Sequence, residues 1–311
     1  MSEQLASSAA VPVTTRRRGG WWHPDWHGLV WVSPWLLGAT AFLFVPMALS
    51  LYYSFTDYPL LEPPLWVGLG NYARMAGDPT FWRVVKNTAV YCLWSIPLQT
   101  GLAVALAAML NGRIPLRRFF QACIFLPTLV PLIASAMVWM WLFNGEYGLI
   151  NRLLAMVGIR GPTWLVDKNW VMPAMVLMSL WGVGQAVVVY IAALQDVPRQ
   201  LYEAARIDGM GRLAQFRYVT LPMISPAILF NVIALTINSV QVFAVPYVMF
   251  RRPDGQNPAG HFYSMYLYEN AFVYGQMGYA SAMAWVQLVV VLALTGLMIV
   301  ASRRLVHYRR V

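Results

Sequence analysis

The stretch YASAMAWVQLVVVLALTGLMIVAS, residues 279–302, contains no Asp, Glu, Lys or Arg. About 20 consecutive apolar residues are enough for a helix to cross the hydrocarbon core of a bilayer. A single charge at the centre of such a helix costs about 2.5–3.5 kcal/mol on insertion scales, so a charge-free run of this length is typical of a membrane span. Because lipid offers the backbone no hydrogen-bonding partner, the span is expected to be a helix.

Five further runs are equally free of charge, and they cover residues 29–54, 88–110, 119–143, 170–194 and 222–247. The whole chain is 59% hydrophobic and 11% charged, whereas a soluble domain carries about 25% charged residues. A very hydrophobic soluble helical protein is the alternative, and the length of these runs disfavours it. We predict an all-α, polytopic membrane protein with six transmembrane helices.

The basic residues predict the orientation of these helices. With the N-terminus inside, 14 of the 22 Lys and Arg residues fall in inner segments, as the positive-inside rule requires of cytoplasmic loops. We therefore predict that both termini lie in the cytoplasm. The predicted parts are a tail (1–28), a membrane domain (29–302) and a basic tail (303–311). The positive charge is expected to face anionic lipid, not nucleic acid.

Nothing in the chain predicts catalysis, a metal site or a cofactor of its own. Cys92 and Cys123 fall inside predicted spans and are read as small apolar residues. The only lysines are Lys86 and Lys168, and neither follows a phosphate-binding loop. A membrane-embedded enzyme is the alternative, but the chain's four histidines form no recognisable ligand cluster. ATP and Mg²⁺, if they drive this protein, are therefore expected on a separate subunit.

One loop between spans, residues 195–221, is polar and prone to form helix. It contains most of the stretch EAARIDGMGRLAQFRYVTLP, residues 203–222. Asp196 is predicted to cap a first helix that Gly209 ends, and a second short helix, about 211–220, precedes Pro222. A helical wheel places Ala204 and Ala205 together on one side as a smooth ridge. The alternative is a solvated connector in which Glu203 pairs with neighbouring arginines.

Three uncharged amides lie in the fifth span, at Asn231, Asn238 and Gln241. On a helical wheel they share one broad face. Because an amide both donates and accepts hydrogen bonds, this face suits a neutral, hydroxyl-rich solute. Hydrogen bonding between helices is the alternative, and it stays open. Tryptophans such as Trp139 and Trp181 could stack on sugar rings, although packing is the commoner role.

The loop resembles the EAA loop of permease subunits of bacterial ATP-binding-cassette importers, in its residues Glu203, Ala204, Ala205, Asp208, Gly209 and Pro222. The resemblance implies a type I importer permease fold and a location in the bacterial inner membrane. It also implies that this loop forms the coupling helix that docks in a cleft of a cytoplasmic ATPase, with Glu203 to Gly209 as the docking residues.

Further motifs resemble the carbohydrate-uptake branch of that family, in its maltose- and glycerol-phosphate-type first permease. They include GLGNY at 68–72, DPTFW at 78–82, Asn87 with Thr88, and Gly148 with Asn151. This resemblance implies sugar import. It also implies four kinds of partner: a second permease, two ATPase subunits, an extracytoplasmic substrate-binding protein and the sugar itself.

The chain departs from the family after the fifth span, where it reads FRRPDGQNP, residues 250–258. Arg251 and Arg252 would suit a phosphate, so an importer of a sugar phosphate such as glycerol 3-phosphate is an alternative. An ion-coupled secondary transporter is a second alternative. Such proteins often keep an ionisable group within the membrane, and the six predicted spans contain none.

Overall fold

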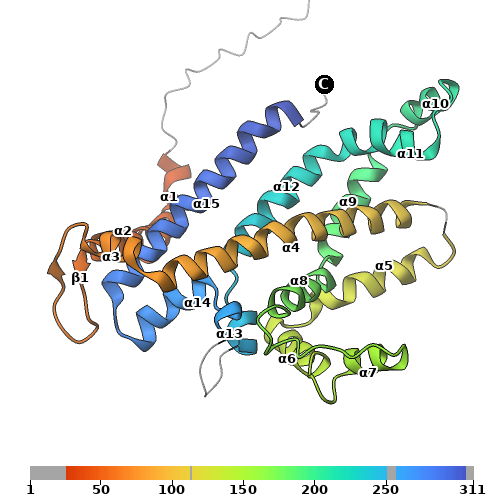
Figure 1. Ribbon diagram of the computed structural model, residues 1–311. Helices are drawn as coiled ribbons and strands as arrows, with labels where there is room; N and C mark the ends of the chain where they lie inside the picture. The colour runs from red at the N-terminus through yellow and green to blue at the C-terminus, as the bar shows by residue number, and fades with distance from the viewer. Residues whose placement is uncertain (1–25, 113, 251–256, 306–311) are drawn as a thin grey trace, which may run out of the picture. The chain divides into compact units, whose positions relative to one another are not determined.

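The computed structural model describes residues 26–112, 114–250 and 257–305, which fall into two compact units, Met1–Leu49 and Ser50–Val311. Each unit is described by itself. Helices dominate both units, and the only strands among the described residues form one short hairpin (Figure 1).

The first unit consists of α1 (Trp26–Ala39), a π-helical turn (Thr40–Phe44) and the beginning of α2 (Val45–Ser54). A helix of 25 apolar residues, Val30–Ser54, matches the first predicted span. Pro34 lies inside α1, and its ring nitrogen cannot donate to the carbonyl one turn earlier. The Ser33 hydroxyl donates to that carbonyl, of Val30, at 2.8 Å. The proline is therefore accommodated without an unpaired backbone oxygen.

The second unit begins at the end of α2, followed by the antiparallel strands β1 (Thr56–Asp57) and β2 (Leu65–Trp66) and by α3 (Gly70–Gly77). The long helix α4 (Pro79–Asn111) follows and contacts helices from most of the later chain. It starts nine residues before the predicted second span. Its first turns lie in what the sequence suggested was a loop.

The remaining helices alternate between long spans and short connecting pieces. They are α5 (Arg117–Phe125), α6 (Leu132–Leu142), α7 (Leu149–Met156), α8 (Val171–Trp181), α9 (Gly184–Gln195), α10 (Arg199–Ile207), α11 (Arg212–Gln215), α12 (Leu221–Val240), α13 (Ala244–Phe250), α14 (Tyr263–Tyr268) and α15 (Met277–Leu305). Short 3₁₀ turns cover Leu126–Leu129 and Pro258–Gly260, and π-helical turns cover Phe216–Thr220 and Glu269–Val273.

Within the described part of the chain, four helices are long and apolar enough to cross a membrane, and two bent helix pairs raise the number to six. The third span bends by 100° between α5 and α6, and the fourth by 49° between α8 and α9. The expectation of one helix per apolar run is wrong for these two spans. Prolines at 127 and 131 interrupt the third span, and Gly182 lies at the bend of the fourth.

The two bends pack against each other through a glycine. A Cβ atom on Gly184, the first residue of α9, would lie 2.3 Å from the Ile124 carbonyl oxygen and 2.9 Å from the Phe125 Cα. Both atoms belong to the backbone of α5 and cannot rotate away. Glycine therefore permits a backbone approach that fixes the third span against the fourth.

The fifth span is longer than predicted, because α11, the following π-helical turn and α12 run on without a sharp bend. Residues Arg212–Phe250 form one rod of 39 residues. Pro226 cannot donate to the carbonyl of Pro222, and the Ser225 hydroxyl donates to it instead at 2.7 Å. The prolines that were expected to start the span therefore lie inside the rod.

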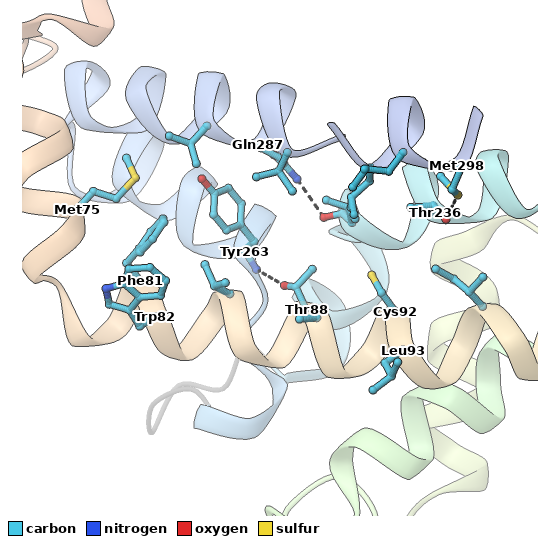
Figure 2. Close-up of a pocket in the computed structure, with 18 of the residues that line it drawn as sticks. Met75, Phe81, Trp82, Thr88, Cys92, Leu93, Thr236, Tyr263, Gln287 and Met298 are labelled. Atoms are coloured by element: carbon cyan, nitrogen blue, oxygen red, sulfur yellow. Dashed lines mark hydrogen bonds between the residues drawn. The ribbon is translucent and has the colours of Figure 1, made fainter. Parts of the chain in front are cut away.

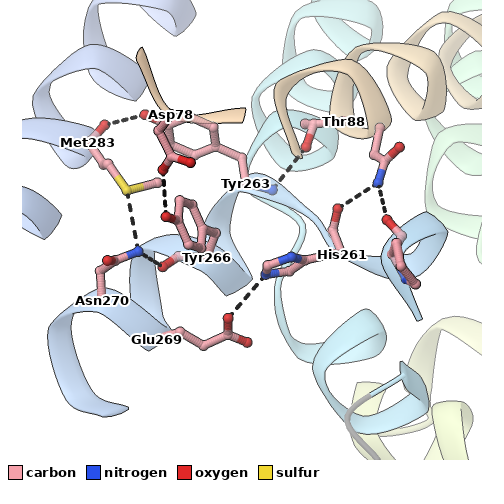
Figure 3. A network of polar contacts seen from close by, with 10 residues as sticks. Asp78, Thr88, His261, Tyr263, Tyr266, Glu269, Asn270 and Met283 are labelled. Carbon is pink, nitrogen blue, oxygen red and sulfur yellow. Dashed lines mark hydrogen bonds and ion pairs between the residues drawn. The ribbon is translucent and has the colours of Figure 1, made fainter. Parts of the chain in front are cut away.

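The polar clamp is the set of contacts through which Asp78, Asn87 and Thr88 hold the segment 258–279 (Figure 3). The Asn87 amide donates to the carbonyls of Pro258 and His261 at 2.8 and 2.9 Å. The Thr88 hydroxyl accepts the backbone N–H of Tyr263 at 3.0 Å. These polar groups of α4 thus fix the connection between the fifth and sixth spans.

Asp78 caps α4 and also joins the clamp. One carboxylate oxygen accepts the Thr80 N–H at 2.8 Å, and the other accepts the hydroxyls of Tyr266 and Tyr279 at 2.6 and 3.0 Å. Burial alone would raise the pKa of Asp78, but these hydrogen bonds outweigh it and hold the pKa below its ordinary value. Burial and the Asp78 charge together raise the pKa of Tyr266 to about 12. The tyrosine therefore remains a hydrogen-bond donor at neutral pH.

We predict that Gly184→Ala destabilises the protein by roughly 1–3 kcal/mol, because the new methyl group would overlap the α5 backbone. The readout is the thermal unfolding midpoint of the purified protein in detergent. Gly182→Ala is the matched control, since the new methyl would lie 3.8 Å from its nearest neighbour, the Ser179 carbonyl oxygen. Equal midpoints for the two variants would contradict the proposed close packing.

We predict that Asp78→Ala costs about 1–2 kcal/mol of stability at neutral pH, through loss of the helix cap and two hydrogen-bond acceptors. Because the pKa of Asp78 is lowered in the folded state, its contribution is present above the ordinary carboxyl pKa. The difference from wild type should shrink as the pH falls below about 4. Asp57→Ala, which removes an exposed carboxylate outside the helix cap, is the control and should unfold like wild type at neutral pH.

Candidate coupling loop and solute path

The helix α10 carries the loop residues singled out in the sequence, and it ends at Gly209 as predicted. Gly209 adopts a positive φ of 74°. Its N–H donates to the Arg206 carbonyl at 3.0 Å, and the Met210 N–H donates to the Ala205 carbonyl at 2.8 Å. This pair of bonds is the Schellman arrangement, which satisfies the last carbonyls of a helix. The end of α10 is therefore locally fixed.

The start of α10 differs from the prediction. Pro198 precedes the first helical residue and makes no side-chain cap, whereas Asp196 ends the preceding helix α9. The fourth span therefore runs almost directly into α10, separated from it by only three residues. Asp196 was a plausible cap by residue type, but the residues before it continue the helix of the span.

The two alanines of the loop do not form one accessible ridge. Ala205 is only 4% exposed and faces the chain itself, whereas Ala204 is exposed. The accessible face instead carries Gln200, Glu203, Ala204 and Ile207, whose spacing follows the helical period, and Ile207 is 87% exposed. The face open to another protein is therefore rotated away from Ala205.

Hydrogen bonds attach α10 to the beginning of the fifth span. The Tyr202 and Thr220 hydroxyls lie 3.0 Å apart, and the Gln215 amide donates to the Met210 carbonyl at 2.8 Å. Sequence reasoning missed Tyr202 and Thr220. Tyr202 precedes Ala205 by three residues, so the two share the inward face of α10. This helical spacing could have identified Tyr202 as a residue that faces the chain. These contacts make α10 and the rod a connected body.

The charges of α10 point outward. Glu203, Arg199 and Arg206 are exposed, and no ion pair joins Glu203 to either arginine among the described residues. The solvated-connector alternative expected such a pair. The Glu203 carboxylate thus forms no ion pair within α10.

The amides of the fifth span do not share one accessible face. Asn231 is buried, and its side chain donates to the Ala227 carbonyl at 3.1 Å. Asn238 and Gln241 are exposed, and Asn238 donates to the Ala234 carbonyl at 2.8 Å. A helical wheel gives relative angles only, so it could not show that neighbouring elements cover Asn231. The candidate solute path retains Asn238 and Gln241.

A break in the helix places Gln241 at the end of α12. Residues 241–243 are not helical, and the Gln287 amide of α15 donates to the Val240 carbonyl at 3.0 Å and to the Ser264 hydroxyl at 3.1 Å. Gln287 lies ten residues beyond the start of α15, which corresponds to about 15 Å along the axis of this apolar helix. Irregular backbone at membrane depth is tolerated where it is buried in protein or lines a water-filled cavity. The exposed Gln241 favours the second case.

A separate groove of about 950 Å³ lies between α4 and α15 (Figure 2). Its lining is almost wholly apolar and includes Trp82, Leu93, Leu294 and Leu297. Such a lining suits hydrocarbon and offers few partners to hydroxyl groups. We therefore do not assign this groove to the solute path.

Other residues that carried the resemblance have structural contacts. The Asn151 amide donates to the Gly145 and Pro162 carbonyls at 2.9 and 3.1 Å and accepts the Trp164 indole N–H at 2.7 Å. Trp139 and Trp181 pack edge to face, 6.0 Å apart. Trp139 packs against the core, whereas Trp181 is 38% exposed. Arg251 and Arg252 lie outside the described residues.

Comparison with known proteins agrees with this geometry. A family model described as "Binding-protein-dependent transport system inner membrane component" matches residues 99–308. The probable ABC transporter permease protein YesP of Bacillus subtilis is 36% identical over 90% of this chain and 92% of its own length. The lactose transport system permease protein LacF of Rhizobium radiobacter is 31% identical over 90% of this chain and 95% of its own length.

A solved structure has the same fold. It is a bacterial ABC transporter involved in the import of the acidic polysaccharide alginate. One of its chains superposes on this chain with a TM-score of 0.80 at 22% sequence identity, and the match covers 91% of this chain and 97% of that chain. This confirms the predicted type I importer permease architecture. The chain belongs to the family of binding-protein-dependent transport system inner membrane components, the multi-pass permease subunits of ABC importers.

Proposed function

We propose that this chain is one of two permease subunits of an ATP-driven, binding-protein-dependent sugar importer. In this assembly it forms half of the translocation path and couples that path to ATP hydrolysis through α10. The observation that carries the proposal is the exposed face of α10, because it belongs to a helix fixed to the rod of the fifth span. Displacement of that face would move a span.

ATP and Mg²⁺ bind partner ATPase subunits in this proposal, and this chain holds no cofactor. Both termini and α10 lie in the cytoplasm, where the ATPase is available, as the distribution of arginines favours. Glu203, Ala204, Asp208 and Gly209 contact the ATPase cleft, and Ala205 supports them from inside the chain. Pro222 lies in the rod behind them.

The solute is a neutral sugar in this proposal. Asn238 and Gln241 are uncharged, exposed and adjacent to a break at membrane depth, and amides pair well with hydroxyl groups. LacF and the trehalose/maltose permease MalF of Thermococcus litoralis, which is 31% identical over 86% of this chain, are named for sugars. An extracytoplasmic binding protein would deliver the sugar, and the second permease would complete the path.

We predict that Ala204→Trp reduces the amount of ATPase recovered with this chain, because the bulky ring would fill the face that docks. The assay is affinity purification after co-expression with the candidate second permease and ATPase. Leu61→Trp is the control. Leu61 is fully exposed in the loop between β1 and β2, far in sequence from α10, and this variant should retain the ATPase. Glu203→Gln should reduce the recovery of ATPase less than Ala204→Trp does, because an exposed ion pair contributes only about 0.2–1 kcal/mol.

The Ala205→Trp variant serves a different purpose. Because Ala205 is buried in this chain, its replacement should lower the unfolding temperature of the isolated chain. It should also reduce the amount of ATPase recovered. If Ala204→Trp retains the ATPase fully, α10 is not the dock. If the chain alone moves solute without any ATPase, the ion-coupled alternative replaces the importer.

We predict that Asn238→Ala and Gln241→Ala each raise the KM for sugar uptake roughly threefold to tenfold, the equivalent of one lost hydrogen bond. Uptake is measured in cells that express the complete transporter. Asn231→Ala is the matched control, because the same group is removed from a buried site on the same helix. Asn231→Ala should lower thermal stability and leave the KM unchanged. If Asn231→Ala raises the KM while Asn238→Ala and Gln241→Ala do not, the solute path lies on the Asn231 face of the helix.

A further inference from the structure

The helix α7, in the outer connection between the third and fourth spans, has its polar and apolar sides reversed relative to a surface helix of a water-soluble protein. Its inward side carries the buried Asn151, whose side chain makes three hydrogen bonds within the chain. Its outward side carries the apolar stripe, defined as Leu149, Leu153 and Met156, and Met156 is 80% exposed. A contiguous exposed apolar stripe is typical of a surface that contacts lipid or another protein.

Local packing fixes the orientation of this stripe. Ile150 and Leu154, on the inward side of α7, pack against the core. A Cβ atom on Gly148 would overlap the backbone of the turn that precedes α7, and one on Gly161 would overlap the Asn151 side chain. The two glycines therefore hold α7 closely at its beginning and beyond its end, so the helix cannot turn its stripe inward without breaking the Asn151 contacts.

Exposed aromatic residues indicate where α7 lies relative to the bilayer. The helix lies beside α6, which ends the third span (Figure 1). Trp141 near the end of α6, Tyr147 just before α7 and Trp170 just before α8 are all exposed. Tryptophan and tyrosine collect at the membrane–water interface. Because such residues occur on both sides of α7 in the chain, the helix is expected at the level of the lipid headgroups.

The charge around the stripe is wholly positive. The segment 147–166 contains Arg152 and Arg160 and no acidic residue, and both arginines are exposed. Counted at about 100° per residue from Leu149, Arg152 falls at about −60° and the exposed Ala155 at about −120°. Arg152 therefore lies at the edge of the stripe, where its stem can cover apolar surface while its guanidinium reaches a phosphate. No ion pair joins it to an acid among the described residues.

We propose that α7 is a lipid anchor in the outer leaflet. The apolar stripe enters the boundary between headgroups and acyl chains, and Arg152 and Arg160 bind the phosphate of an anionic phospholipid. Amphipathic helices that lie in the interface combine buried apolar area with attraction to anionic lipid in this way. A soluble partner fits less well, because a transient protein interface is about as polar as the rest of a protein surface, whereas the stripe holds only leucine and methionine.

The test measures lipid contact at single labelled positions in the assembled complex of both permeases and the ATPase, reconstituted in liposomes. Cys92 and Cys123 are replaced by alanine, and one cysteine is placed at Leu153 or at Ala155 and labelled with the fluorophore NBD. Ala155 is the matched control, because it is exposed on the same helix about 160° from Leu153. The liposomes contain phosphatidylcholine and phosphatidylglycerol, and either lipid carries a nitroxide on its acyl chain, which quenches the fluorophore on contact.

If α7 is the anchor, nitroxide lipid quenches the label at position 153 and leaves the label at position 155 close to its value without nitroxide. Phosphatidylglycerol quenches the label at position 153 more than an equal amount of phosphatidylcholine does. Arg152→Gln lowers this preference roughly fivefold, the share of one basic residue near a charged membrane surface. Arg152→Lys retains the preference, because the positive charge remains. Addition of the binding protein changes none of these results.

Three results would overturn the anchor, and each identifies a different situation. If nitroxide lipid does not quench the label at position 153 in the assembled complex, the second permease covers the stripe. If the quenching disappears when the binding protein is added, the stripe is a docking surface for that protein. If the two lipids quench equally, or if Arg152→Gln leaves their ratio unchanged, no phosphate is bound at Arg152.

Discussion

One hydrogen bond, from the Gln287 amide to the Val240 carbonyl, shows the constraint on which this fold depends. Within a bilayer each backbone carbonyl needs a partner from the protein itself. The same need is met at Pro34 by Ser33 and at Pro226 by Ser225, each of which donates to the carbonyl that the proline leaves unpaired. Irregularity in these spans is therefore confined to places where a side chain can compensate for it.

The broken spans become stable for a related reason. The bend of the third span lies against the bend of the fourth, and Gly184 brings the two backbones together. Polar groups of α4 then hold the connection between the fifth and sixth spans from the other side. The irregular parts of the chain thus support one another and leave Asn238 and Gln241 accessible.

Much of the fold could be predicted, because a charge-free run has few outcomes other than a span. The end of α10 at Gly209 also followed from residue type, since glycine readily adopts a positive φ. The burial of Ala205 and Asn231 could not be predicted in the same way. A helical period fixes which residues share a face, but only the neighbouring helices decide which face is covered.

The bends mark a second limit. Proline and glycine interrupt helices by residue type, but the sequence analysis predicted no bend in the third or fourth span. The angles of 100° and 49° depend on how the two interrupted spans fit together. The role of α10 as a docking helix was available from resemblance, whereas its attachment through Tyr202 required the structure.

The rod Arg212–Phe250 has a mechanical consequence. Its continuous helical part, Arg212–Val240, has a length of about 43 Å. For a rigid lever of that length, a tilt of about 5° at one end moves the other end by about 4 Å. A displacement of side-chain size at one end of the helix thus needs only a slight rotation at the other, and the break at 241–243 lies where that lever ends.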